Sequence, residues 1–331
     1  MTKRGGLYYL GGDLGSTHTR IALADETGQI VGFGESGSGN HEVVGFENVS
    51  HNVQVALDKA MGVAGINLEQ IVGAGFGISG YDWDAEREAH LRALSALELT
   101  APLEIVNDTI LGLLVGSVSG WGIAVVSGTG CNCWGWNKTR TRIGQVAGGG
   151  WEMGEAGGSA ELVMRAVQFV AHAWSLRGPA TSLTDAFVKH VSAGSVDDLL
   201  EGLMDKRYRI DASAAPLVIR TAEMGDLVVN EVICWAGNEL AELAKAVIRQ
   251  LDFQMIEFEL VLIGSLVQNN GQLREVFRKA VLDFAPQAKI SHLNMPPVVG
   301  AVLLGMRQAG LEPGSEVKQT LAQSLARLKI G

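Results

Sequence analysis

The stretch Gly11-Gly12-Asp13-Leu14-Gly15-Ser16-Thr17-His18-Thr19-Arg20 decides how the rest of this 331-residue chain is interpreted. An apolar run precedes it and another follows from Ile21, so two short strands joined by a turn of small residues predict a β-hairpin. Successive backbone N–H groups in such a turn can bind an anion, and the carboxylate of Asp13 can hold a metal ion. For this stretch alone, a glycine-rich hairpin without a ligand is an equally good interpretation.

A second stretch, Ser127-Gly128-Thr129-Gly130, repeats this pattern later in the chain. The strand predicted at 123–126 leads into it, and the apolar run 133–136 leads out. Each turn opens a section in which strands and helices alternate, which predicts an α/β protein made of two related halves. Two such turns, one in each half, favour a pair of phosphate-binding loops more strongly than either turn does alone.

Composition and charge narrow the class of protein. Hydrophobic residues make up 47% of the chain and charged residues 19%, so a large core can form, and the length suits two domains. The net charge of −10 disfavours nucleic acid and anionic membranes as partners. Three cysteines, Cys131, Cys133 and Cys234, argue against a disulfide framework. No apolar run suits a signal peptide or a membrane span, so we expect a cytoplasmic protein.

Hydrophobic periodicity and turn signals predict the order of the elements. Beyond the two hairpins, strands are expected at 29–34, 71–78, 103–106, 258–263 and 289–293. Helices are expected at 46–61, 85–97, 110–118, 160–174, 183–191, 196–204, 214–251, 272–284, 296–309 and 317–328. The helices between 160 and 251 form a helical insertion in the second half, and the segment 142–158 before them is dominated by glycine.

Asp108 follows a predicted strand and precedes a helix, at the sheet edge where open α/β proteins bind their ligands. A carboxylate there can accept a proton from a substrate hydroxyl, as in kinases. The alternative, favoured for these residues alone, is that Asp108 or Asn107 caps the helix. The polar segment at Gly264-Ser265 suits a nucleotide base or ribose, and equally an ordinary strand-to-helix connection. Gly300-Ala301 allows close packing of another helix.

Taken in order, the motifs resemble the actin-like ATPase superfamily, which includes sugar kinases, chaperones and actin. Within it, the chain resembles the BadF/BadG/BcrA/BcrD ATPase family and most closely its N-acetylglucosamine kinase branch. The motifs that carry this resemblance span nearly the whole chain: Gly12-Asp13-Leu14-Gly15-Ser16-Thr17, Gly77-Ile78-Ser79-Gly80, Val106-Asn107-Asp108, Val126-Ser127-Gly128-Thr129-Gly130-Cys131-Asn132, Gly149-Gly150-Trp151, Gly154-Glu155-Ala156-Gly157, Gly264-Ser265 and Pro297-Val298-Val299-Gly300-Ala301.

The resemblance implies an α/β protein with two domains of ribonuclease-H-like, actin-like ATPase fold and an ATP cleft between them. We expect an N-terminal domain at 1–117 and a C-terminal domain with the helical insertion at 118–307. The final helices, about 308–331, would return to the first domain. Dimers are common in the family, which suggests a homodimer.

The resemblance also implies roles for individual residues. Asp108 would be the catalytic base, and Asp13 would lie near Mg²⁺. The residues expected at ATP are Gly12, Asp13, Gly15, Ser16, Thr17, Ser127, Gly128 and Thr129 along the phosphates, with Gly264 and Ser265 at the adenosine. The residues expected at the sugar are Asn40, Ser79, Gly80, Asp108, Asn132 and Glu155.

Two positions depart from the family pattern. Where the family has Gly-Asp-Glu-Gly, this chain has Gly154-Glu155-Ala156-Gly157, so the carboxylate is one methylene longer and its acidic neighbour is missing. His18 stands where Lys or Arg is common, and it either weakens a phosphate contact or is an ordinary hairpin residue, which we favour. The identity of the sugar and of the phosphorylated hydroxyl therefore stays open.

Three functions are compatible with these residues. The favoured one is an ATP-dependent kinase that phosphorylates a hydroxyl of an amino sugar, N-acetylglucosamine or glucosamine. An ATPase that activates a CoA-ester reductase or dehydratase would need cysteine ligands for an iron–sulfur cluster between subunits. Cys131 and Cys133 lie within the phosphate motif and Cys234 stands alone, which disfavours that role. An ATP-dependent chaperone or binding protein is disfavoured because the chain has no added substrate domain.

Overall fold

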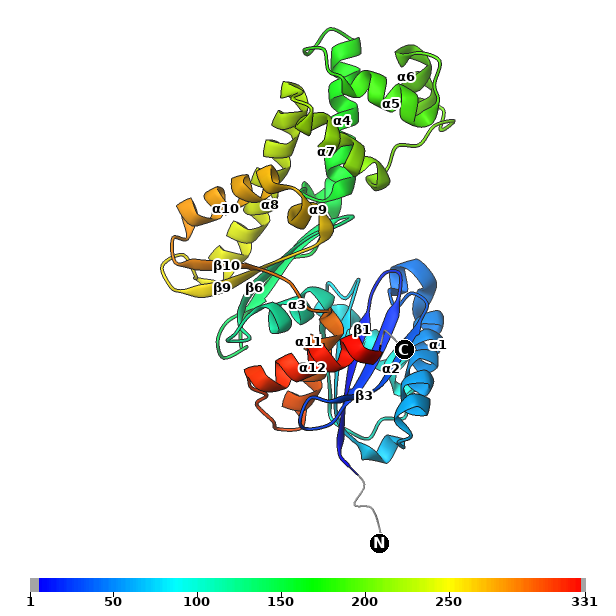
Figure 1. Cartoon of the computed structure of the whole chain (residues 1–331), viewed down its shortest axis with the longest axis vertical. Helices are drawn as coiled ribbons and strands as arrows, with labels where there is room; N and C mark the ends of the chain where they lie inside the picture. The colour runs from blue at the N-terminus through cyan, green and yellow to red at the C-terminus, as the bar shows by residue number, and fades with distance from the viewer. Residues whose placement is uncertain (1–5, 329–331) are drawn as a thin grey trace. The chain divides into compact units, whose positions relative to one another are not determined.

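The computed structural model describes residues 6–328, and the chain forms two compact units. The first comprises Met1–Ala124 and Leu293–Gly331, and the second comprises Val125–His292. These borders differ from those we expected after residues 117 and 307. The chain thus enters the second unit once and returns once to the first, as the colour sequence in Figure 1 shows.

A mixed five-stranded sheet organises the first unit. Its strands are β1 (Tyr8–Leu14), β2 (Thr19–Ala24), β3 (Ile30–Ser36), β4 (Ile71–Ile78) and β5 (Leu103–Asn107), in the spatial order β3-β2-β1-β4-β5. β1 and β2 are antiparallel and place Gly11 opposite Ala22, so the predicted hairpin is confirmed. β4 runs parallel to both β1 and β5, which brings the ends of β1, β4 and β5 to one edge of the sheet.

Alternate residues of β1 face two separate hydrophobic clusters, as the period of a strand requires. Leu10 and Leu14 pack with α1 (His41–Ala64) and α2 (Arg87–Ser95). Tyr9 faces the other cluster, with α3 (Asp108–Gly116), α11 (Pro297–Gln308) and α12 (Ser315–Leu328). Short 3₁₀ turns at Leu68–Gln70 and Asp84–Glu86 precede β4 and α2.

Helix α11 belongs to the first unit, whereas our expected border placed it in the second. The reason is a backbone-to-backbone approach that only glycine allows: a Cβ at Gly11 would lie 2.3 Å from the Val302 nitrogen on α11. Helix α12 is fixed to the same unit, because the Ile30 amide donates to Ser324 Oγ at 3.0 Å.

The second unit has a sheet with the same strand order when the strands are counted within each unit. Its strands are β6 (Gly122–Ser127), β7 (Cys131–Trp136), β8 (Ile143–Val146), β9 (Phe258–Ile263) and β10 (Ala288–His292), arranged β10-β9-β6-β7-β8. This shared topology supports the interpretation of two related halves. We did not expect β8, because this short edge strand contains Gly144 and shows little apolar alternation.

Seven helices of the second unit lie within its described residues: α4 (Ser159–Trp174), α5 (Leu183–Val191), α6 (Val196–Met204), α7 (Ala215–Glu223), α8 (Leu227–Leu251), α9 (Ser265–Asn269) and α10 (Gly271–Phe284). Short 3₁₀ turns occur at Gly150–Met153 and Ala212–Ala214. The single helix expected at 214–251 is wrong, because Gly225 (φ +94°) interrupts it and Asp226 caps α8. No helix within residues 6–328 is both long and apolar enough to span a bilayer.

Candidate active site

Asn107, and not Asp108, caps helix α3. The Asn107 side-chain oxygen accepts a hydrogen bond from the Thr109 amide at 3.0 Å. Its Nδ2 donates to the Tyr81 carbonyl at 3.2 Å and to Asp82 Oδ1 at 2.9 Å, so this buried side chain is used in full. Asp108 therefore occupies the first helical position, and its carboxylate is not needed as the N-cap.

The carboxyl group of Asp108 has an unusual acidity. Burial, together with the negative charge of Asp13, raises the pKa of Asp108 to about 7. Hydrogen bonds from the Ser79 hydroxyl and the Thr109 amide act in the opposite direction and lower the pKa. A carboxyl group with a pKa near neutrality can both accept and release a proton under physiological conditions.

Three polar side chains gather beside Asp108 at the same sheet edge. Ser16 Oγ in the hairpin turn lies 2.9 Å from Ser79 Oγ at the end of β4. Asn40 Nδ2 lies 3.4 Å from both hydroxyl oxygens, while Asn40 Oδ1 caps α1 by accepting from the Glu42 amide. Gly80 has φ +79°, and a Cβ there would lie 2.9 Å from Asn40 Oδ1. The four sugar-site candidates of this unit, Asn40, Ser79, Gly80 and Asp108, are therefore brought together.

The turn between β1 and β2 presents unused backbone donors. Within residues 6–328, the amides of Ser16, Thr17 and His18 have no protein acceptor, whereas the Gly15 amide closes the turn on the His18 carbonyl at 2.9 Å. The three residues at the tip are exposed. Consecutive free N–H groups in one turn can bind phosphate oxygens. Gly12 is buried in β1 and supports the turn from within the sheet.

Asp13 lies behind this turn, and its side chain is almost fully buried. Arg20 on β2 approaches it, with Nη1 3.8 Å from Asp13 Oδ2, and also donates to Glu35 at 2.7 Å. His18 lies on the exposed side, with Nδ1 3.7 Å from the same Glu35. His18 thus pairs with a carboxylate on β3, as an ordinary hairpin residue would.

Asp13, whose negative charge acts on the nearby Asp108, can attract a divalent cation. The charge of Asp13 opposes ionisation of Asp108, and a cation near both would relieve this repulsion. Magnesium in phosphoryl-transfer sites is held by one or two carboxylates, with phosphate oxygens and water as the other ligands. The residues present therefore fit Mg²⁺ bound together with a nucleotide.

The second turn has a different internal structure. The amides of Ser159 and Ala160, at the start of α4, each donate at 2.9 Å to the carbonyls of Gly128 and Thr129. Within the described chain, the amides of Thr129 and Gly130 have no protein acceptor, and both residues are exposed. The turn is therefore fixed through its carbonyls and leaves two N–H groups available for an anion.

The hydroxyl group of Ser127 is not available for a contact with phosphate. Ser127 is fully buried, and its Oγ donates to the Gly157 carbonyl at 2.6 Å. Its side chain ties the end of β6 to the loop before α4, so only its backbone borders the turn.

Ser127→Ala is expected to lower the free energy of unfolding of the second unit by about 1–3 kcal/mol, because it leaves the buried Gly157 carbonyl without a donor. Chemical denaturation measures this change. Thr129→Ala, on the exposed tip of the same turn, is the matched control and should leave stability unchanged. Equal stability of Ser127→Ala and wild type would contradict the structural role.

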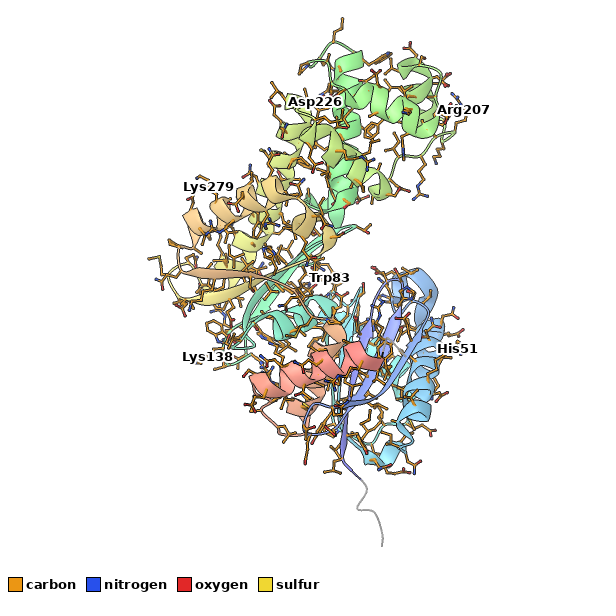
Figure 2. All side chains as sticks on the ribbon, viewed as in Figure 1. His51, Trp83, Lys138, Arg207, Asp226 and Lys279 are labelled. Atoms are coloured by element: carbon orange, nitrogen blue, oxygen red, sulfur yellow. The ribbon has the colours of Figure 1, made fainter. Side chains whose placement is uncertain are left out.

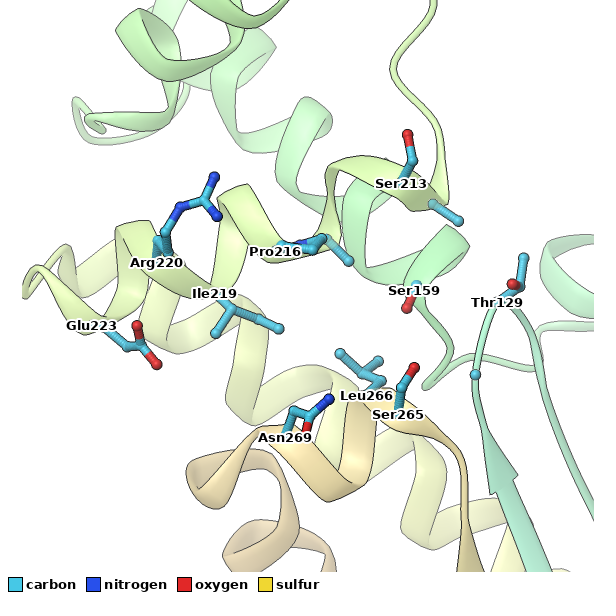
Figure 3. Close-up of a pocket in the computed structure, with 13 residues that line it drawn as sticks. Thr129, Ser159, Ser213, Pro216, Ile219, Arg220, Glu223, Ser265, Leu266 and Asn269 are labelled. Carbon is cyan, nitrogen blue, oxygen red and sulfur yellow. The ribbon is translucent and has the colours of Figure 1, made fainter. Parts of the chain in front are cut away.

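A pocket of about 580 Å³ in the second unit collects the nucleotide-site candidates Gly128, Thr129 and Ser265. Figure 3 shows α7 on one side of the pocket, with Pro216, Ile219, Arg220 and Glu223, and α9 on the other side, with Ser265, Leu266 and Asn269. Gly264 adjoins the turn at 127–130, since a Cβ there would lie 2.2 Å from the Ser127 carbonyl oxygen. A pocket of this size, lined by both apolar and polar residues beside free amides, suits a nucleoside and its phosphates.

Sequence reasoning missed the α7 side of this pocket. Pro216, Ile219, Arg220 and Glu223 recur at spacings of three and four residues, which puts them on one helix face. The opposite face buries Val218 and Ala222 in the core. This stripe was visible in the sequence, but only the fold shows that it faces α9.

The two sugar-site candidates of the second unit lie near each other. Glu155 Oε2 accepts a hydrogen bond from the Gly148 amide at 2.7 Å. A Cβ at Gly148 would lie 3.2 Å from Asn132 Cβ, so Gly148 adjoins both residues. Ala156 is buried, which places a small apolar side chain where the family pattern has an acid.

The cysteines are unpaired, and two of them are inaccessible. Cys131 and Cys133 are buried within β7, and burial raises the pKa of Cys131 to about 12. Cys234 on α8 is partly buried. Among residues 6–328, no group of three or more His, Cys, Asp or Glu side chains is arranged to bind a metal ion.

Comparison with known families identifies the chain. The model of the BadF/BadG/BcrA/BcrD ATPase family matches residues 10–305. The chain belongs to this family. Its members are ATPases and sugar kinases, so membership implies ATP binding, and the resemblance inferred from the motifs is confirmed.

Curated relatives of the chain include sugar kinases. An N-acetyl-D-glucosamine kinase of Dictyostelium discoideum is 27% identical over 313 residues, which cover 90% of this chain and 97% of the relative. An N-acetylmuramic acid/N-acetylglucosamine kinase of Clostridium acetobutylicum is 27% identical over 304 residues, with the same coverage.

Solved structures confirm the predicted fold class. A Chromobacterium violaceum protein matches with a TM-score of 0.67 and 24% identity over 91% of this chain and 99% of its own. A ROK family glucokinase from Streptomyces griseus, in complex with glucose and AMPPNP, matches with a TM-score of 0.52 and 17% identity, covering 90% and 98% of the two chains. The chain therefore has the mixed α/β fold of actin-like ATPases.

Proposed function

We propose that this chain is an ATP-dependent kinase that phosphorylates a hydroxyl of an amino sugar, N-acetylglucosamine or glucosamine. The observation that carries the proposal is Asp108, a carboxyl group with a pKa near 7 that a neighbouring cap leaves available and that polar side chains surround. The two relatives that phosphorylate N-acetylglucosamine support the choice of sugar.

In the proposed reaction, Asp108 accepts the proton of the sugar hydroxyl while that oxygen attacks the terminal phosphate of ATP. Asn40, Ser79 and Glu155 orient the sugar through hydrogen bonds. The free amides of Ser16, Thr17 and Thr129 donate to phosphate oxygens, which gain charge during transfer. Mg²⁺, held near Asp13, supplies positive charge that neutralises the phosphates.

We also propose where ATP binds, in which compartment the enzyme acts and how its chains assemble. We assign ATP phosphates to one turn of each unit, and the nucleoside to the pocket lined by Ser265. The negative charge of the chain and its free cysteines favour the cytoplasm and a small-molecule substrate. A homodimer and the division into two actin-like domains are parts of the same proposal.

The test is ADP formation measured against a panel of sugars, with the product identified by mass spectrometry. We expect ADP release that depends on N-acetylglucosamine or glucosamine and a phosphomonoester of that sugar in equal amount. N-acetylmuramic acid and glucose complete the panel, because Glu155 alters the reach of one sugar contact. ADP release that no sugar stimulates would overturn the kinase assignment.

The pH dependence provides a second test. Protonated Asp108 cannot accept a proton, so kcat/KM for the magnesium–ATP complex, which reports the enzyme before that complex binds, should fall about tenfold per pH unit below an acidic limb near pH 7. ATP itself titrates in this range, which makes Asp13→Asn the informative control. The Asp13→Asn variant removes the negative charge that raises the pKa of Asp108. The acidic limb in the pH profile of its residual activity should therefore move to lower pH. If the acidic limb of Asp13→Asn lies at the same pH as that of wild type, titration of ATP and not of Asp108 causes it.

A further inference from the structure

A second groove lies in the helical insertion, between α5 and α7. It has a volume of about 410 Å³, within the range of small-molecule sites. Lys189 and His190 at the end of α5 line it together with Arg220 on α7, while Leu217 and Met224 supply apolar surface. None of these residues takes part in the phosphate-binding turns.

The groove is positively charged in a protein whose net charge is −10. Three of its lining residues are basic and none is acidic. Within residues 6–328, neither Lys189 nor Arg220 forms an ion pair. By contrast, Arg207 on the same insertion pairs with Asp198, Glu201 and Asp205. Figure 2 shows Arg207 near α6.

Two carboxylates of the helical insertion, Asp226 and Asp211, are occupied by other groups. Asp226 Oδ2 accepts hydrogen bonds from Thr181 Oγ1 and from the Ser182 amide and hydroxyl, at 2.6–2.9 Å. Asp211 pairs with Arg209 Nε at 3.2 Å. Lys189 and Arg220 are therefore not held by ion pairs within the described residues and remain available to an anion from solution, whereas His190 lies within electrostatic reach of Asp211.

We propose that the α5–α7 groove binds a small phosphomonoester, such as a sugar phosphate, as a regulatory ligand. The dianionic phosphate would contact Lys189, His190 and Arg220, and the carbon skeleton would lie on Leu217 and the Met224 side chain. The two cations without an ion pair in the described chain, Lys189 and Arg220, match a phosphate dianion better than a carboxylate, which carries a single charge, and the His190 imidazole adds a hydrogen-bond donor beside them.

Arg220 links this groove to the nucleotide pocket, because its side chain lines both cavities. If a phosphomonoester in the groove holds the Arg220 guanidinium toward α5, that guanidinium is less available to a nucleotide in the other pocket, which Ile219 and Glu223 line. Phosphomonoester and nucleotide should therefore weaken each other's binding by the same factor, as linkage requires. This coupling, though not binding to the groove, rests on the proposed nucleotide site.

Calorimetric titration of the full chain with glucose 6-phosphate, without ATP, tests binding directly. We expect saturable binding that Lys189→Gln weakens at least tenfold and that Met224→Glu abolishes. Met224 is 86% exposed, so its replacement does not threaten folding. Lys206→Gln, which removes the same charge elsewhere on the insertion, is the matched control and should bind like wild type.

Two further titrants separate the parts of the ligand. Glucose alone should not bind the groove, and inorganic phosphate should bind more weakly than glucose 6-phosphate. Equal affinities for the two phosphates would overturn the role of Leu217 and Met224 in holding an organic group. No saturation by about 10 mM glucose 6-phosphate, or equal affinities for Lys189→Gln and Lys206→Gln, would overturn the site itself.

The coupling is measured by titrating ADP with and without saturating glucose 6-phosphate. ADP affinity should fall in wild type, and Arg220→Gln should remove this difference. Unchanged ADP affinity in wild type would overturn the link through Arg220. Absence of sugar phosphorylation would instead overturn the kinase proposal and leave the calorimetric result on the groove intact.

Discussion

Asp108→Asn should reduce sugar phosphorylation by about a thousandfold or more and leave ADP affinity unchanged. The amide keeps the size of the side chain and its place beside Ser79, but it cannot accept a proton, and a positioned base contributes 10²–10⁴ in rate. The measurements are single-turnover phosphorylation and ADP titration of the same sample. Asp84→Asn, an exposed carboxylate of the same unit, is the control and should retain full activity.

The same variant should be more stable than wild type at pH 8. The pKa of Asp108 is about 7 in the folded chain and about 3.9 in an unfolded chain, so the group costs stability progressively as pH rises from about 4 to 7. A neutral amide avoids that cost, and we expect a gain of up to about 4 kcal/mol at pH 8 that disappears near pH 4. Retained phosphorylation, or a loss of stability at pH 8, would contradict the role given to Asp108.

Gly264→Ala should damage both the stability of the second unit and nucleotide binding. Gly264 has φ +108° and ψ 154°, a region essentially restricted to glycine, which by itself costs about 1–3 kcal/mol for alanine. The added Cβ would also lie 2.2 Å from the Ser127 carbonyl oxygen, which is backbone and cannot rotate away. We expect a total loss of at least about 3 kcal/mol, measured by denaturation.

Gly128→Ala separates the two effects. No atom lies within 4 Å of a Cβ at Gly128, so its stability should match that of wild type. Gly128 lines the pocket, however, so a methyl group should still weaken ADP binding. Equal stability of Gly264→Ala and Gly128→Ala would contradict the close approach of Gly264 to the Ser127 carbonyl.

Local pattern was sufficient to predict much of the fold. Short apolar runs with turn residues on both sides define β4 and β9, and apolar residues at helical spacing define α5 and α6. The predicted bounds of these four elements match the structure. Two predictions failed because they depended on single residues. Gly225 interrupts an otherwise continuous helical pattern, and Gly144 interrupts the alternation of an edge strand.

The site was predictable in outline but not in its hydrogen bonds. Asp108 could be placed at a sheet edge from its neighbours, but its release from capping depends on Asn107 bonding to Tyr81 and Asp82, which are distant in sequence. Ser127 has the residue type of a phosphate ligand, yet its hydroxyl is directed to the carbonyl of Gly157. Such long-range contacts are set by the packing of whole elements, which local periodicity does not contain.

Because α11 and α12 belong to the first unit, the two units can complete their folding only in a fixed order during synthesis on the ribosome. Residues 125–292 form one continuous segment and can assemble as soon as they emerge, since domains generally fold as units during synthesis. The first unit must wait for Val302 and Ser324, even though its sheet is translated first. During that interval one face of the nascent sheet is covered only by α3 and lacks α11 and α12, so apolar side chains such as Tyr9 and Ala22 stay uncovered longest.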